Sequence, residues 1–207
     1  MPAMRSRAMI RTRARLKADD EDVPSKAGDE FAEQARAYKR QAQKDEDDGD
    51  HAAAERNYAK EAGARHKAAE EYKQAGEIED AIKQYRREAI ARRHAAEQAD
   101  ADGRPGDAAD HYAKAAKAYE AAGMTYVDAN ENDAAAKQFG DAGKYYEEAA
   151  KKNLADDDKD GAAANYQKAA TAYNAGKSIT PEPADAIKLK WKANNALKKK
   201  KELQKPP

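Results

Sequence analysis

The stretch GDAADHYAKAAKAYEAAG, from Gly106 to Gly123, is one unit of a repeat that recurs through most of the chain. The first aromatic residue of this stretch is Tyr112, and steps of 27 residues from it in both directions reach only aromatic side chains. These residues are here called the anchors: Phe31, Tyr58, Tyr85, Tyr112, Phe139 and Tyr166. The constant spacing between successive anchors is called the repeat step. The residue four positions before each anchor is alanine, and the residue four positions after it is alanine or glycine. Because the 207 residues include only 2 phenylalanines and 11 tyrosines, this regularity indicates a repeat architecture.

The composition favours helices held together by small side chains. Charged residues make up 38% of the chain and the formal net charge is zero, so no charge of one sign covers the whole protein. Leucine, isoleucine, valine and phenylalanine together make up only 15 of the 207 residues, far below the ~20% share that is typical of globular domains. Alanine, the best helix former, is the dominant apolar residue. We therefore expect an all-α protein with thin, alanine-rich packing and modest stability.

Each unit predicts one helix of about 18–23 residues, with its apolar face at the anchor and at steps of three or four around it. One continuous helix would not bury these faces together, because one repeat step amounts to about 7.5 helical turns and successive anchors would point to opposite sides. Short connections between separate helices place neighbours antiparallel. The predicted fold is an antiparallel helical-repeat array, an α-solenoid of about six 27-residue units followed by a C-terminal cap helix.

Clusters of glycine, proline, asparagine and aspartate separate the units, as is typical of helix ends. They are Asp47–Asp50, Gly76, Asp102–Gly106, Asn130–Asn132 and Asp156–Gly161. The isolated Gly123 and Gly176 are, like Gly76, interpreted as helix terminators. At Gly123 this would split the fourth unit and leave Met124–Ala129 as a short second piece.

The repeat pattern changes after Gly176. Thr180 and Pro181 predict a helix start, with the threonine as cap and the proline in the first turn. A last helix from about Ala184 to Glu202 carries Ile187, Trp191 and Leu197. One repeat step beyond the last anchor reaches an alanine here, so we interpret this helix as the terminal cap.

Charge and pattern together divide the chain into three segments. Residues 1–24 form a basic and then acidic N-terminal segment, residues 25–178 the helical-repeat domain, and residues 179–207 the cap helix with a basic tail. Residues 1–17 carry six positive and no negative side chains, a composition that resembles a mitochondrial presequence, although a flexible basic tail is the preferred interpretation. Both ends of the chain are therefore basic and its body is acidic.

Several kinds of chemistry find no support in the sequence. The absence of cysteine excludes disulfides, thiolate catalysis and cysteine-ligated zinc, and it fits a cytoplasmic location. No phosphate-binding loop or HExxH zinc motif occurs. The pairs His94 with Glu97 and His66 with Glu70 share helical faces, as in metal sites of helical bundles, but solvated pairs explain them better. We expect no catalysis, no metal, no cofactor and no small-molecule substrate.

The repeat units resemble the helices of the tetratricopeptide-like solenoid in NSF attachment proteins, the SNAPs. That family repeats an Asp-Ala-Ala, aromatic, Ala-Gly or Ala-Ala, aromatic pattern, found here in NDAAAKQFGDAGKYYEEA from Asn132 to Ala149 and in the stretch quoted first. Similar spacing marks the second helix of ordinary tetratricopeptide repeats, as in Asp80-Ala81-Ile82 with Tyr85. The resemblance covers about residues 28–176. It implies an adaptor that presents a curved helical face to a helical bundle of membrane-fusion proteins.

The cap helix and basic tail supply the candidate partner-binding residues. Trp191 is the sole tryptophan, a residue type that is common in binding hot spots, and lysines surround it. The candidates are Lys188, Lys190, Trp191, Lys192, Lys198, Lys199, Lys200 and Lys201. For Trp191 the alternative is packing on the last repeat, and for the lysine run it is a solvated tail.

The sequence therefore predicts a non-catalytic adaptor or scaffold that binds a helical protein partner. The alternative is a peripheral factor that docks on an anionic membrane or on nucleic acid through its basic termini. Nucleic acid is disfavoured, because the aromatic side chains have alanine neighbours at helical spacing and so belong to the core. Peripheral membrane attachment and a mitochondrial location are alternatives to a purely cytoplasmic one.

Overall fold

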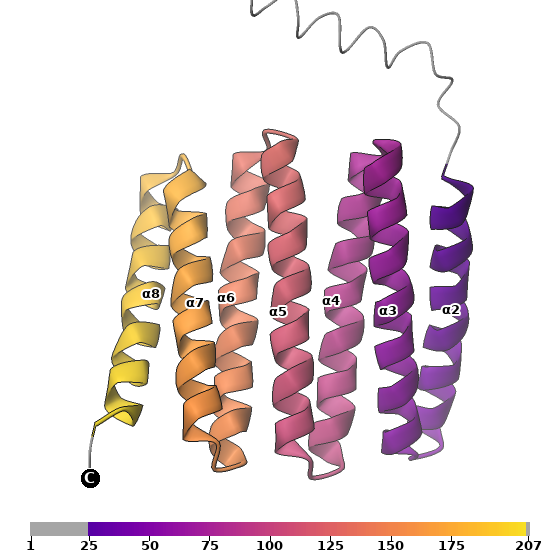
Figure 1. The fold of residues 1–207 in the computed structure, drawn as a ribbon, viewed down its shortest axis with the longest axis horizontal. Coiled ribbons are helices and arrows are strands. Elements are labelled where there is room, and N and C mark those ends of the chain that lie inside the picture. The colour runs from indigo at the N-terminus through magenta and orange to yellow at the C-terminus, as the bar shows by residue number, and fades with distance from the viewer. Residues whose placement is uncertain (1–24, 206–207) are drawn as a thin grey trace, which may run out of the picture.

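The computed structural model describes residues 25–205, and these form seven α-helices and no strand (Figure 1). The helices are α2 (Lys26–Asp47), α3 (His51–Ala75), α4 (Ile78–Ala101), α5 (Pro105–Asp128), α6 (Asn132–Ala155), α7 (Lys159–Ile179) and α8 (Pro183–Leu203). Each helix packs against its neighbours in the sequence, so that α2 and α8 lie at opposite ends of one row (Figure 1). The predicted all-α repeat solenoid is confirmed. The basic segment 1–17 and its possible targeting role lie outside the described residues.

A left-handed residue recurs at the turns with the same step as the anchors. Helices α4 to α7 each begin one repeat step after the start of the previous helix. The residues with positive φ, between 58° and 84°, are Gly49, Gly76, Gly103, Asn130 and Asp157. The amide of the following residue donates to the carbonyl five residues before it, at 2.8–2.9 Å, which closes each turn. Glycine adopts this conformation freely and asparagine and aspartate tolerate it, which explains why the turns carry these residues.

Alanine makes most of the core, and the anchors fill the spaces between helices. The alanines before and after Tyr85, Ala81 and Ala89, are both fully buried, as their counterparts are around most other anchors. Tyr58, Tyr85 and Tyr166 are buried, and the other three anchors, Phe31, Tyr112 and Phe139, are half-buried. Small side chains at the interfaces let the helix axes approach closely, and the aromatic rings then fill the gaps that remain.

Two glycines that were predicted to end helices lie inside them. Gly123 is within α5, which continues to Asp128, and Gly176 is within α7. A Cβ at Gly123 would lie 3.3 Å from the Phe139 ring, and one at Gly176 would lie 3.0 Å from the Ala136 carbonyl oxygen. The prediction of a split fourth unit is therefore wrong, because these glycines serve close approach between helices rather than chain reversal.

The start of the last helix is also corrected. Helix α7 ends at Ile179, Thr180 is its extended C-cap, and α8 begins at Pro183 rather than at Thr180-Pro181. The residue before a proline is biased towards extended backbone, which ends α7 at this position. Pro183 then occupies the first turn of α8, where its missing N–H removes no hydrogen bond. The predicted span from Ala184 to Glu202 lies within the observed helix.

Polar side chains are paired between helices, including helices two apart in the row. The Tyr58 hydroxyl on α3 donates to Glu46 on α2 at 2.7 Å, and Tyr146 on α6 donates to Glu120 on α5 at 2.9 Å. The Nε2 atom of His111 on α5 lies 3.0 Å from Glu55 on α3, which also pairs with Arg104. Such pairing compensates the cost of burying polar groups in a thin core.

Candidate functional site

A groove runs between α6 and α8 and crosses over α7. It consists of two cavities of about 400 Å³ and 460 Å³, and they adjoin because Lys144 and Lys192 line both. Small or apolar residues of α6 and α8 line the first cavity: Ala136, Gly140 and Leu189. Tyr173 of α7 and Trp191 of α8 both line the second. The groove is therefore apolar at its base over much of its length.

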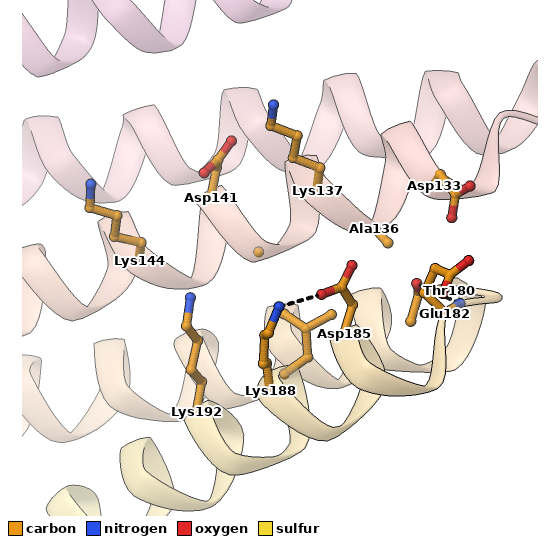
Figure 2. A pocket seen from close by; sticks show the side chains of 12 residues that line it. Asp133, Ala136, Lys137, Asp141, Lys144, Thr180, Glu182, Asp185, Lys188 and Lys192 are labelled. Carbon is orange, nitrogen blue, oxygen red and sulfur yellow. Dashed lines mark hydrogen bonds and ion pairs between the residues drawn. The ribbon is translucent and has the colours of Figure 1, made fainter.

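Charged side chains of both signs form the two walls of the first cavity. Lys137, Asp141 and Lys144 project from α6, while Lys188 and Lys192 face them from α8 (Figure 2). The Lys188 ammonium donates to Asp185 at 2.9 Å, the contact drawn as a dashed line in Figure 2. Partial burial raises the pKa of the Asp141 carboxyl, although nearby lysines oppose the shift. A partner that enters here meets alternating charges on both sides of an apolar base.

Glycines set the depth of the groove. Tyr173 packs on Gly143 so closely that a Cβ at that position would lie 2.5 Å from its ring, and the ring is almost fully buried. The Lys192 ammonium lies 5.4 Å from the centre of the same ring, a cation–π distance. Burial, with a contribution from Glu147, raises the pKa of the Tyr173 hydroxyl, which therefore stays neutral. Of these residues only Lys192 was among the predicted site residues, and the presence of Gly140 and Gly143 in one unit is the one unusual feature that the sequence shows here.

The structure separates the lysines that the sequence grouped as one candidate cluster. Lys199 donates to Glu147 on α6 at 3.3 Å and Lys200 donates to Gln167 on α7 at 3.0 Å, so both tie α8 to the array. Lys198 lies 4.0 Å from Glu202 on its own helix. Within residues 25–205 no ion pair involves Lys190 or Lys201. The candidate residues thus divide between helix docking, the groove and the outer surface.

Trp191 is not part of the core. Its side chain is 66% exposed and that of Ile187 is 69% exposed, and both lie on α8. The contact between α7 and α8 is made instead by Leu189, Ala193 and Ala196, which are buried. The interpretation of Trp191 as a residue that packs on the last repeat is therefore wrong, since the smaller side chains already fill that interface.

The histidine pairs do not converge on a metal site in the described part of the chain. His94 lies 3.1 Å from Glu97, whereas His66 contacts Glu88 on the next helix at 3.0 Å rather than Glu70. Among residues 25–205 no group of three or more histidine, aspartate or glutamate side chains could hold a metal ion. In the same range none of the helices combines the length and apolarity that a membrane span requires.

Comparison with solved structures identifies helical-repeat folds. The crystal structure of the de novo designed helical repeat protein DHR64 is similar with a TM-score of 0.61 and 18% identity, over 95% of this chain and 92% of that chain. The DHF58 filament is similar with a TM-score of 0.57 and 15% identity, over 84% and 82%. A crystal structure of MamA protein covers 84% of this chain and 98% of that chain at 22% identity, but its TM-score of 0.21 supports no argument.

No protein-family model matches the chain, and no curated protein sequence matches it at a significant level. At these low identities the DHR64 and DHF58 structures show the fold alone.

Proposed function

We propose that the protein is a non-catalytic scaffold that binds a helical segment of a protein partner in the groove between α6 and α8. The observation that carries this proposal is the base of the groove, where Ala136 and Gly140 present little more than backbone beside Leu189. A helix of the partner could approach this surface closely and place apolar residues on it at steps of three and four. Enzymatic activity is not needed to explain any feature of the groove.

The charged walls give the partner its expected composition. Lysines and aspartates alternate on α6, and on α8 one aspartate and two lysines face them (Figure 2). A partner helix with a narrow apolar stripe and flanking side chains of both signs complements these walls, and charge complementarity contributes more to specificity than to affinity. We infer an amphipathic helix of mixed charge rather than a strongly acidic or basic peptide.

The resemblance to SNAPs suggests a finer assignment, which we also propose. The partner would be a bundle of helices in membrane trafficking, and the scaffold would act at the cytoplasmic side of a membrane. This assignment is supported by the Asp-Ala-Ala, aromatic pattern that recurs along residues 28–176.

The decisive experiment fills the groove at Gly140. The Gly140→Leu variant is expected to fold, because a Cβ there would lie 3.5 Å from Leu189, an ordinary contact, and the longer side chain then occupies the first cavity. Gly63→Leu on α3 is the matched control, since a Cβ at that helical glycine meets nothing within 4 Å. The tagged full-length protein and each variant are used to capture interacting proteins, and the captured proteins are quantified by mass spectrometry.

A helical partner that is depleted about tenfold or more by Gly140→Leu, a change of about 1.4 kcal/mol, and is retained by Gly63→Leu supports the groove. Capture of the same proteins in the same amounts by both variants would show that the groove is not the binding site. Circular dichroism and thermal melting of both variants establish that the array is intact.

A further inference from the structure

We propose that the outer face of α8 docks on an anionic lipid membrane. In this arrangement Ile187 and Trp191 enter the headgroup region, while Lys190, Lys198 and Lys201 contact the lipid phosphates and carboxylates. This surface adjoins the second cavity of the groove, which Trp191 and Lys198 also line, but none of its residues lines the first cavity.

The repeat itself provides an internal control for Trp191. The repeat step, applied backwards from this position, reaches only exposed residues, and five of the six are charged: Asp29, Arg56, Lys83, Asp110, Lys137 and Ala164. Six helices of the same array therefore fold with a solvated side chain at this position. The fold does not require an indole here, and burial in the core does not account for it.

Ile187 fits the same argument. Its repeat equivalents are small or acidic in every unit: Ser25, Ala52, Glu79, Gly106, Asp133 and Asp160. Ile187 and Trp191 are four residues apart and lie on one face of the helix, opposite the buried Leu189, Ala193 and Ala196. Two exposed apolar side chains thus occupy adjacent positions that are small or polar elsewhere in the array.

Lysines surround this apolar pair. Lys198 continues the same face about two turns beyond Trp191, and Lys190 and Lys201 flank it. Of the acidic residues of α8, Asp185 pairs with Lys188 at 2.9 Å. Glu202 lies 4.0 Å from Lys198, and both side chains are exposed, so the Lys198 ammonium stays accessible. Tryptophan is enriched at membrane interfaces, and lysines beside it add electrostatic attraction to anionic lipids.

The position of Lys190 argues against a further repeat helix as the occupant. Its equivalents in α4 to α7, each of which has a following helix packed on it, are the buried residues Ile82, Ala109, Ala136 and Ala163. A second copy that continued the array would bury the Lys190 ammonium without a partner, which is costly. A lysine in place of these apolar residues suits a terminal capping helix, because the outer face of such a helix stays in solvent.

Nucleic acid explains less of this surface than lipid does. The phosphates of a nucleic acid and those of a lipid would both attract the lysines. Of these two partners, only the lipid interface also stabilises an exposed isoleucine beside a tryptophan. Lipid is therefore the occupant that uses every distinctive residue of the face.

The sole tryptophan makes a direct test possible. Full-length protein is mixed with vesicles of phosphatidylcholine alone and of phosphatidylcholine with phosphatidylserine, and binding is measured by co-sedimentation and by Trp191 fluorescence. The expected result is binding to the anionic vesicles, a blue shift of the emission, and quenching by lipids brominated near the headgroup. Replacement of Lys190 and Lys201 by glutamine should weaken binding about fivefold for each lysine.

Matched variants separate this face from the rest of the chain. The double variant Ile187→Ser with Trp191→Ser should weaken co-sedimentation about tenfold or more, whereas Met124→Ser, a change at another exposed apolar residue, should leave it unchanged. Lys114→Gln with Lys117→Gln on α5 is the control for charge. Circular dichroism verifies the helicity of each variant.

Each other outcome overturns the proposal. Binding that leaves the Trp191 emission unchanged, or that survives the double serine variant, would assign vesicle binding to another basic part of the chain. Absence of vesicle binding would exclude the membrane, and binding to an oligonucleotide but not to vesicles would assign the lysines to nucleic acid. The Gly140→Leu variant should bind vesicles normally, so failure here is distinguishable from failure of the groove.

Discussion

At the scale of single residues, the side chain on the left-handed position decides how much strain each turn contains. Three turns have glycine there, whereas Asn130 and Asp157 have side chains at φ values of 62° and 58°. An L-residue in this region costs roughly 1–2 kcal/mol, less for asparagine and aspartate. The same backbone geometry is thus reached at different free energy in different turns.

We predict that Asp157→Gly stabilises the protein by about 0.5 kcal/mol, because relief of strain exceeds the extra backbone entropy that glycine loses on folding. Asp157 is exposed, and no side-chain hydrogen bond to it is present among residues 25–205. Gly76→Ala, at a φ of 84°, should instead destabilise the protein by about 1 kcal/mol. Urea unfolding of both variants measures the difference, and a destabilised Asp157→Gly would contradict the strain argument.

A second pair of glycine substitutions tests close packing. We predict that Gly143→Ala costs about 1–3 kcal/mol, because the new Cβ would lie 2.5 Å from the rigid Tyr173 ring. Gly63→Ala should stabilise the protein by about 0.5–1 kcal/mol, since the Cβ meets nothing and alanine favours the helix. The two unfolding free energies should therefore move in opposite directions. A shift of the same sign for both would show that helix propensity alone governs these sites.

At the scale of helices, a buried histidine connects two elements that are not adjacent in the sequence. The Nε2 atom of His111 on α5 is bound to Glu55 on α3, while its Nδ1 atom is buried without a hydrogen-bond partner in the described structure. Protonation would place an unsatisfied donor at Nδ1. Burial lowers the pKa of His111 below its usual value, the positive charges of Arg92 and Lys114 add to this, and Glu55 opposes it.

This arrangement predicts a specific pH dependence. The folded state holds neutral His111, and the unfolded state takes up a proton as the pH falls through about 6.5, so the wild type should lose stability below that pH. Because glutamine does not titrate, the wild type should lose stability relative to His111→Gln between pH 8 and pH 5. Urea unfolding of both proteins across this range gives the difference. A difference that is constant with pH, or that favours the wild type at low pH, would contradict the prediction.

The helices were predictable because each depends on local residues. The anchors and their alanines define the buried stripes, and the clusters around Gly49, Gly76 and Gly103 define the turns. Gly123 misled the prediction because its role depends on Phe139 of the next helix, a contact that spacing within one unit does not encode. Thr180-Pro181 misled it because two prolines compete for the first turn of α8: Thr180 serves instead as the extended C-cap of α7, and Pro183 takes the first turn although its N-cap, Glu182, makes no side-chain hydrogen bond.

At the scale of the whole molecule, the groove was not predictable from the sequence. Its walls belong to α6 and α8, two units apart, and their separation depends on the twist that accumulates along the array. Lys188 and Lys192 were candidates because they flank the sole tryptophan, whereas Gly140 and Asp141 have no feature in the sequence that relates them to α8. The different character of α8 was predictable, because one repeat step beyond Tyr166 reaches Ala193 rather than an aromatic residue.

An array in which each helix contacts mainly its neighbours should respond locally to damage. We predict that Leu189→Ala, which removes a side chain buried between α7 and α8, costs about 2–4 kcal/mol in the local stability of these helices. Amide hydrogen exchange should then accelerate in α7 and α8 and remain unchanged in α2 and α3.

The reciprocal variant is Tyr72→Phe, which removes the hydrogen bond from the Tyr72 hydroxyl to Asp29 at 2.6 Å and should accelerate exchange only in α2 and α3. If both variants changed exchange along the entire row, the array would unfold as one cooperative unit. The groove between α6 and α8 would then depend on every interface in the molecule, whereas local response leaves it dependent on only the last three helices.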